Sequence, residues 1–209
     1  MKMIKFVSIG EVNIGKTRFF QILNEIEDKK EYIPTIGVNY FSFNRALNDN
    51  IYKCRFWDTG GGKMFVNLIK TYVEGCDCCI LFFDYNEINS IKYINENIER
   101  IRNYNPEIHF IAIGFNYNHY NLNDLNLVSF VKLKKEMDKL RALDIKTYQL
   151  VCFKRYYIYN LMIKLIEDYV DYCNNENIII KDKELSFDEQ NQIVSNKNWF
   201  QKFITCCFF

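Results

Sequence analysis

The sequence has few histidines, almost no net charge and no long apolar run, and each shortage argues against a class of protein. The two histidines, His109 and His119, stand far from a CxxC partner, which argues against a metal site of the zinc-finger kind. The net charge of +1, from 27 basic and 26 acidic residues, argues against nucleic-acid binding. No stretch approaches the roughly 18 apolar residues of a membrane span, and no signal-peptide pattern opens the chain. We therefore expect a protein made in the cytosol.

Cysteine and other apolar residues, in contrast, are plentiful. Eight cysteines in a cytosolic chain predict reduced thiols, most of which behave as small buried apolar groups. A length of 209 residues with 49% apolar residues suffices for one core and is short for two domains. From about residue 174 the sequence turns polar and loses its periodicity. We expect a globular domain over residues 1–173 and a flexible tail over residues 174–209.

Strand-like and helix-like segments alternate along the domain. Continuous apolar runs predict buried strands, and apolar residues at helical spacing predict amphipathic helices. A polar turn at residues 48–50 predicts a hairpin. This order indicates an α/β protein with a mainly parallel sheet, helices on both faces and one antiparallel edge. The expected strands are 4–9, 38–47, 51–57, 78–83, 109–114 and 147–153, and the expected helices are 16–26, 64–73, 91–101, 130–143 and 159–172.

The segment between the first strand and the first helix fits the phosphate-loop pattern GxxxxGK[ST]. It runs Gly10-Glu11-Val12-Asn13-Ile14-Gly15-Lys16-Thr17. Its glycines let the backbone N–H groups and the helix N-terminus approach phosphates closely. Lys16 offers charge to the β- and γ-phosphates, and the Thr17 hydroxyl binds Mg²⁺. The expected nucleotide-binding residues of this segment are Gly10, Asn13, Ile14, Gly15, Lys16, Thr17 and Arg18.

Two further loops contain the other groups that a magnesium site needs. Pro34-Thr35-Ile36-Gly37-Val38 follows the first helix, and Trp57-Asp58-Thr59-Gly60-Gly61 lies at the end of the third strand. Five of the eight glycines lie in these loops and the phosphate loop, and Gly62 follows directly after the last of them. A threonine hydroxyl and a carboxylate suit a metal ion that bridges two phosphates. We expect Thr17, Thr35 and Asp58 to bind Mg²⁺.

These motifs resemble those of the Ras superfamily, and specifically of Rab proteins, over residues 1–172 and the last four residues. Residues 34–40 look like the Rab effector loop, and residues 56–59 are similar to the segment that enters the second switch. The resemblance implies a P-loop NTPase with six strands and five helices, which binds GTP or GDP with Mg²⁺ and acts as a switch in membrane trafficking. It further implies that Thr35 and the Gly61 amide sense the γ-phosphate, that Lys16, Thr35 and Gly61 serve catalysis, and that effectors, exchange factors and activating factors are partners.

Two positions depart from the family where hydrolysis is concerned. Gly62 stands where the family has a glutamine that positions the attacking water, and Val12 is bulky at a position that crowds the transition state. Both predict slow hydrolysis. Drift with catalysis supplied by a partner is one alternative, and a pseudo-GTPase acting as a membrane-tethered binding module is a second. A nucleotide kinase is a third, although the sequence lacks an arginine-rich lid.

The guanine-binding motif is also altered. The family's Asn-Lys-x-Asp aligns with Phe115-Asn116-Tyr117-Asn118, or with Asn116 in the first position if the register shifts by one. A carboxylate accepts hydrogen bonds from two N–H groups of guanine, whereas Asn118 offers one acceptor and one donor, which weakens guanine binding and suits xanthine. The segment Cys152-Phe153-Lys154 resembles the family's Ser-Ala-Lys, which is the last loop of the nucleotide site. The expected base contacts are Asn116, Asn118, Cys152, Phe153 and Lys154.

The last four residues, Cys206-Cys207-Phe208-Phe209, resemble Rab termini that carry two geranylgeranyl groups. Two lipid chains anchor a protein stably, and the tail has four lysines against five acids, so it offers no polybasic help. We expect lipidation of Cys206 and Cys207, with prenylation machinery and a prenyl-binding chaperone as partners. The expected location is the cytoplasmic face of an intracellular membrane, in exchange with the cytosol.

Overall fold

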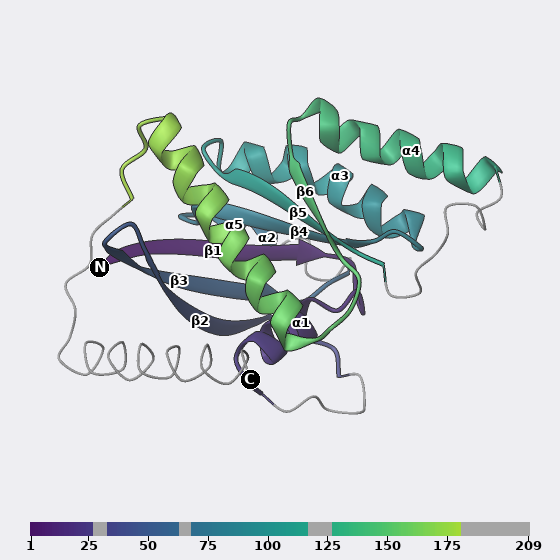
Figure 1. Cartoon of the computed structure of the whole chain (residues 1–209). Helices are drawn as coiled ribbons and strands as arrows, with labels where there is room; N and C mark the ends of the chain where they lie inside the picture. The colour runs from purple at the N-terminus through teal and green to yellow at the C-terminus, as the bar shows by residue number, and fades with distance from the viewer. Residues whose placement is uncertain (27–32, 63–67, 117–126, 181–209) are drawn as a thin grey trace.

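A single twisted sheet organises the chain. The computed structural model describes residues 1–26, 33–62, 68–116 and 127–180 (Figure 1). Within them, six strands lie in the order β2-β3-β1-β4-β5-β6, and only the β2–β3 pair is antiparallel. This confirms the predicted α/β fold with one antiparallel edge. The strands are β1 (Lys2–Gly10), β2 (Val38–Leu47), β3 (Asn50–Thr59), β4 (Cys78–Asp84), β5 (His109–Phe115) and β6 (Lys146–Leu150).

A two-residue turn forms the antiparallel edge. Leu47 pairs with Asn50, so Asn48 and Asp49 alone connect β2 to β3. Both have positive φ values, 46° and 60°, as a type I′ turn requires. Asn and Asp tolerate this left-handed conformation better than most side chains. The hairpin predicted at residues 48–50 is therefore present, and its turn fixes the β2–β3 register.

Five helices cover the two faces of the sheet among the described residues (Figure 1). Side chains of α1 and α5 belong to one buried cluster, and side chains of α2, α3 and α4 belong to the other. Alternate residues of β1 join different clusters, Phe6 the first and Val7 the second, because successive side chains of a strand point to opposite faces. The helices are α1 (Lys16–Leu23), α2 (Ile69–Val73), α3 (Ile88–Tyr104), α4 (Leu127–Ala142) and α5 (Arg155–Asn175).

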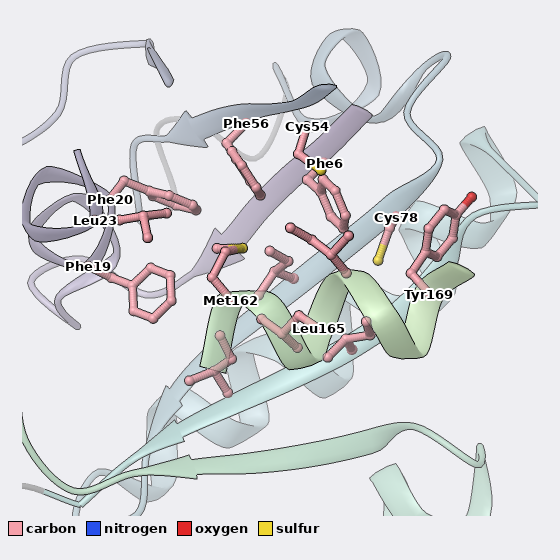
Figure 2. Packing of buried hydrophobic residues seen from close by; sticks show 14 of the residues in the cluster. Phe6, Phe19, Phe20, Leu23, Cys54, Phe56, Cys78, Met162, Leu165 and Tyr169 are labelled. Atoms are coloured by element: carbon pink, nitrogen blue, oxygen red, sulfur yellow. The ribbon is translucent and has the colours of Figure 1, made fainter. Parts of the chain in front are cut away.

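Aromatic rings fill the layer beneath α5 (Figure 2). Phe6 of β1 stacks on Phe56 of β3 with ring centroids 4.9 Å apart, and Tyr169 of α5 meets Phe6 edge-on at 5.9 Å. Phe20 of α1 lies 5.2 Å from Phe56. Such pairs add about 0.5 to 1.5 kcal/mol each to the stabilisation from area burial. They hold α1, and with it the end of the phosphate loop, firmly against the sheet.

The described domain continues past the boundary expected at residue 173. Helix α5 ends at Asn175, and Ile180 belongs to the first cluster with 9% of its surface exposed. Polar residues 174–177 masked the apolar run Ile178-Ile179-Ile180 that follows them in the sequence. The flexible tail therefore stays a prediction only for residues beyond 180, which lie outside the described part.

Two expectations drawn from composition can be compared with the described residues. All six cysteines that the structure describes are free, and burial raises the pKa of the Cys76 thiol to about 12, so this thiol stays protonated at neutral pH. None of the described helices combines the length and the apolar character that a membrane crossing demands.

Candidate nucleotide and magnesium site

The phosphate loop joins β1 to α1 and lies at the carboxyl edge of the sheet, where parallel α/β folds bind ligands. A Cβ on Gly10 would lie 2.5 Å from the backbone oxygen of Phe82 in β4, so only glycine fits there. Asn13 (φ 58°) and Gly15 (φ 98°) turn the chain, and Ile14 packs into the first cluster. Packing against β4 and the first cluster therefore fixes the backbone conformation of the phosphate loop.

Lys16 lies inside the loop rather than in solvent. It is 5% exposed, and its Nζ donates hydrogen bonds to the backbone oxygens of Gly10 (2.9 Å) and Glu11 (2.8 Å). Desolvation lowers the pKa of Lys16 to about 8, although the negative charges of Asp58 and Glu11 act in the opposite direction. A buried ammonium group favours a nearby anion, because an opposite charge stabilises its protonated form.

Three oxygen-bearing side chains converge beside Lys16, from the first turn of α1, the loop before β2 and the end of β3. The Thr17 hydroxyl donates to Asp58 Oδ2 at 2.6 Å, and the Thr17 and Thr35 hydroxyl oxygens lie 2.8 Å apart. Asp58 is fully buried, and burial raises its pKa against the opposing effects of Thr17, Lys16, Asn39 and Ser8. Oxygen ligands that include one carboxylate suit Mg²⁺, which also keeps waters and phosphate oxygens. The residues therefore fit the ion, and the structure brings together the three predicted ligands.

Sequence reasoning missed two residues that hold Asp58. β3 lies between β1 and β2, and the sheet register places Ser8 and Asn39 directly opposite Asp58 on either side. The Ser8 hydroxyl donates to Asp58 Oδ1 at 3.2 Å, and the Asn39 amide donates to Oδ2 at 3.4 Å. The signal was present, since Ser8 is a polar residue in an apolar strand, but the partner depends on a register that the sequence does not show.

The glycines after Asp58 pack against the phosphate loop. The Gly60 N–H donates to the Gly37 oxygen at 2.9 Å, which links the two loops expected to switch. A Cβ on Gly61 would lie 2.5 Å from the Val12 nitrogen and the Glu11 carbonyl carbon. Gly62 has φ +95°, and a Cβ added to it would lie 3.9 Å from the Val12 Cβ. The two departures from the family, Val12 and Gly62, are therefore neighbours in space.

A tyrosine from α3 also reaches this segment. The Tyr93 hydroxyl forms a hydrogen bond with the Gly62 backbone, and burial raises its pKa, as does the nearby charge of Glu11. Tyr93 is partly buried against the second cluster. Helix α3 therefore contacts the segment where the expected glutamine is absent.

The residues expected to contact the base lie at the ends of β5 and β6. Phe115 is fully buried and stacks on Phe82 at 5.6 Å, so its side chain belongs to the core. The Asn116 N–H donates to the Leu150 oxygen at 3.0 Å, which continues the β5–β6 pairing. Cys152 and Phe153 are half-buried, Lys154 is exposed, and Asn118 lies outside the described residues.

Phe153 has an unexpected partner in α1. The Arg18 guanidinium carbon lies 4.8 Å from the centroid of the Phe153 ring, and the Phe115 and Phe153 rings are 5.3 Å apart. The structure therefore brings together Arg18 and Phe153, two residues from distant segments that were both expected to bind the nucleotide.

An exposed apolar surface follows the Thr35 loop. Ile36 is 90% exposed and Tyr40 is 54% exposed. The Tyr40 ring meets Trp57 of β3 edge-on at 5.6 Å, across the antiparallel register. Apolar side chains grouped on a surface in this way are typical of an interaction site.

The fold and the convergent Lys16, Thr17, Thr35 and Asp58 define the class as a P-loop nucleotide-binding protein of the Ras-like α/β type. The chain belongs to the Ras family, whose model matches residues 5–170.

Its relatives include Rab proteins. It is 30% identical over 97 residues to the Ras-related protein Rab7A of Mesembryanthemum crystallinum, with 45% of each chain covered. It is 29% identical over 96 residues to RABG3f of Arabidopsis thaliana, covering 44% of this chain and 45% of the relative. It is 27% identical over 146 residues to the Ypt/Rab-type GTPase ypt7 of Schizosaccharomyces pombe, covering 68% of this chain and 66% of the relative. The chain thus matches just under half the length of the first two relatives.

Proposed function

We propose that this chain is a Rab-like small GTPase that alternates between GTP- and GDP-bound states in intracellular membrane trafficking. The convergence of Thr17, Thr35 and Asp58 next to the buried Lys16 carries the proposal. The three segments that supply these residues are separate in sequence, and Asp58 is a fully buried carboxylate, whose burial is costly unless it is paired. The similarity to Rab7A and ypt7 supports the same assignment.

Each residue has a defined task in nucleotide binding. Lys16 and the N–H groups of the phosphate loop bind the β- and γ-phosphates. Thr17, Thr35 and Asp58 hold Mg²⁺, which when bound neutralises phosphate charge. Thr35 and the Gly61 amide respond to the γ-phosphate, and the Gly60–Gly37 hydrogen bond couples their loops. Loss of the γ-phosphate removes contacts from both loops at once.

We infer that hydrolysis is slow. In the reaction, water attacks the γ-phosphorus in line and the bond to the β–γ bridging oxygen breaks, with Lys16 stabilising the charge that develops. Gly62 has no side chain to orient the water, and its φ of +95° is unfavourable for any residue that has one. Val12 occupies the space beside it with 48% of its surface exposed. A partner that supplies catalytic groups would accelerate the step.

The triphosphate form presents the Thr35–Tyr40 segment and residues 60–68 to effectors, and the same loops receive exchange and activating factors. The exposed Ile36 and the Tyr40–Trp57 pair support this part of the proposal. A ligand-dependent loop next to exposed apolar side chains can report the bound nucleotide to a partner.

Two prenyl groups on Cys206 and Cys207 would anchor the protein to the cytoplasmic face of an intracellular membrane. These cysteines lie outside the described residues, and the proposal rests on their sequence alone. It includes the prenylation machinery and a prenyl-binding chaperone that returns the protein to the cytosol. Mass spectrometry of the full chain from eukaryotic cells tests it: two geranylgeranyl adducts support the anchor, and unmodified thiols contradict it.

The nucleotide proposal is tested on purified full-length protein with Mg²⁺. Co-purifying nucleotide is identified by chromatography, labelled GTP is titrated, and phosphate release is followed. Bound GTP or GDP with slow release is the expected result. Asp58→Ala should weaken GTP binding in Mg²⁺ by on the order of a hundredfold, whereas Asp138→Ala, which removes an exposed carboxylate of α4, should not. Failure of the wild-type chain to bind any nucleotide contradicts the proposal and favours the pseudo-GTPase alternative.

A further inference from the structure

The end of β5 offers an aromatic ring where base recognition needs polar groups. Phe115 is fully buried and stacks on Phe82 with a centroid separation of 5.6 Å, and the tilted ring of Phe153 lies 5.3 Å away. A phenyl ring has no hydrogen-bonding group to direct at a base edge. Its burial also prevents any movement outward without loss of core packing. The Phe115 side chain therefore cannot direct a hydrogen bond at a base.

A second contact surface lies directly beside the phosphate-binding residues. Arg18 follows Thr17 in α1, and its guanidinium carbon lies 4.8 Å above the centroid of the Phe153 ring. Arg18 remains an exposed residue and Phe153 is half-buried. A planar guanidinium that covers one ring can accept another flat group on its outer side. The pair therefore forms a stacking platform within a nucleoside's reach of the phosphate loop.

We propose that the base of the bound nucleotide stacks on the Arg18–Phe153 pair, so that this chain binds nucleoside triphosphates with little discrimination between guanine and other purines. The inference rests on the proposed function, because it assumes that the phosphate loop binds a nucleoside triphosphate. Phosphates and Mg²⁺ then supply most of the affinity. Stacking contributes a smaller part that every purine shares, because each base has a π-face.

The two modes of recognition differ strongly in selectivity. A site built to hydrogen-bond its ligand rejects an analogue that lacks the matching groups by roughly 10⁴- to 10⁵-fold, whereas apolar contacts discriminate by about 10- to 200-fold at most. Two purines of similar size differ still less in stacking. We therefore expect the dissociation constants for GTP, ATP and XTP to lie within about tenfold of one another.

The closing experiment is a competition on the full-length wild-type chain. A fluorescent GTP analogue is displaced by Mg²⁺ complexes of GTP, ATP and XTP at one ionic strength. Dissociation constants within about tenfold of one another support the inference, and a larger preference for any one base overturns it. Absence of binding by all three contradicts the proposed function itself, so the two failures are distinguishable.

Two variants test the platform directly. Phe153→Ala should weaken the binding of GTP and of ATP by the same factor, on the order of tenfold. Tyr156→Ala, which removes an exposed ring from the first turn of α5, should change neither affinity. Should Phe153→Ala fail to fold, Arg18→Ala makes the same test at an exposed position. Unequal loss for the two nucleotides, or tighter binding of GTP alone, shows that the ring does not act as a platform.

Discussion

The phosphate side and the base side of the proposed nucleotide site are built in opposite ways. On the phosphate side, the Thr17 hydroxyl oxygen lies 2.6 Å from Asp58 Oδ2 and 2.8 Å from the Thr35 hydroxyl oxygen, beside the buried ammonium group of Lys16. On the base side, the tilted rings of Phe115 and Phe153 lie 5.3 Å apart, at positions that align with the polar base motifs of the family. A metal ion and its phosphates impose ligand type and geometry, whereas a base also offers a flat face that a ring can meet. The base side can therefore change its chemistry more freely.

Removal of the buried charge should have the largest effect on binding. Lys16→Ala leaves phosphate oxygens without their cationic partner, which costs about 3 to 5 kcal/mol, or roughly a hundred- to several-thousandfold in the dissociation constant for MgGTP. Titration calorimetry measures it. Lys70→Ala, at an exposed position in α2, is the matched control and should bind like the wild type. If Lys16→Ala weakened MgGTP binding by less than tenfold, Lys16 would not be a phosphate-binding residue.

Restoring the family's asparagine at the end of β5 tests the base side. Phe115→Asn deletes a fully buried ring from the aromatic stack and buries an amide, so the free energy of unfolding should fall by about 3 to 5 kcal/mol. Urea denaturation measures the change, and Tyr157→Asn at a half-exposed position serves as the control. A Phe115→Asn variant as stable as the wild type would show that the ring has no structural role there.

A methyl group on Gly10 tests how rigid the phosphate side is. The added Cβ would meet the Phe82 backbone oxygen at 2.5 Å, and neither backbone can move without disturbing β1 and β4. We expect Gly10→Ala to lower the free energy of unfolding by about 1 to 3 kcal/mol. Gly75→Ala meets no atom within 4 Å, so it should cost only the strain of its φ of +70°. Equal stability of Gly10→Ala and the wild type would contradict the close packing described.

Loss of the Ser8 hydroxyl should have the smallest effect. Ser8→Ala leaves Asp58 Oδ1 without its 3.2 Å hydrogen bond, which should cost about 1 kcal/mol of stability and weaken Mg²⁺-dependent GTP binding a few-fold. Thermal unfolding and a Mg²⁺ titration measure the two effects. Ser42→Ala, on the exposed side of β2, is the control. An unchanged Mg²⁺ response would mean that Ser8 does not position the carboxylate.

The sequence was informative wherever the signal is local. Apolar runs predicted the strands to within about three residues at most ends, and the phosphate loop indicated Lys16 and Thr17 by pattern alone. Thr35 and Asp58 could be inferred because a magnesium ion bound to phosphates needs such ligands. The helix at residues 64–73 can be compared only over α2, since residues 63–67 lie outside the described part.

Contacts between distant segments were not predictable. Ser8 and Asn39 reach Asp58 only through the β1–β3–β2 register, and Arg18 meets Phe153 across 135 positions of sequence. The burial of Phe115 was also not predictable, because this residue follows the expected strand 109–114 and its stacking on Phe82 depends on the β4–β5 pairing. In each case the partner is set by tertiary packing, which a single sequence does not reveal.

The dependence of GTP binding on Mg²⁺ tests the central claim most directly. The dissociation constant of the full-length chain for GTP should be measured with Mg²⁺ and again with EDTA, in the wild type and in Asp58→Asn. Convergent Thr17, Thr35 and Asp58 predict that chelation weakens wild-type binding by on the order of a hundredfold or more, and that Asp58→Asn largely removes this dependence. Equal binding with and without Mg²⁺, or no binding at all, would contradict the account.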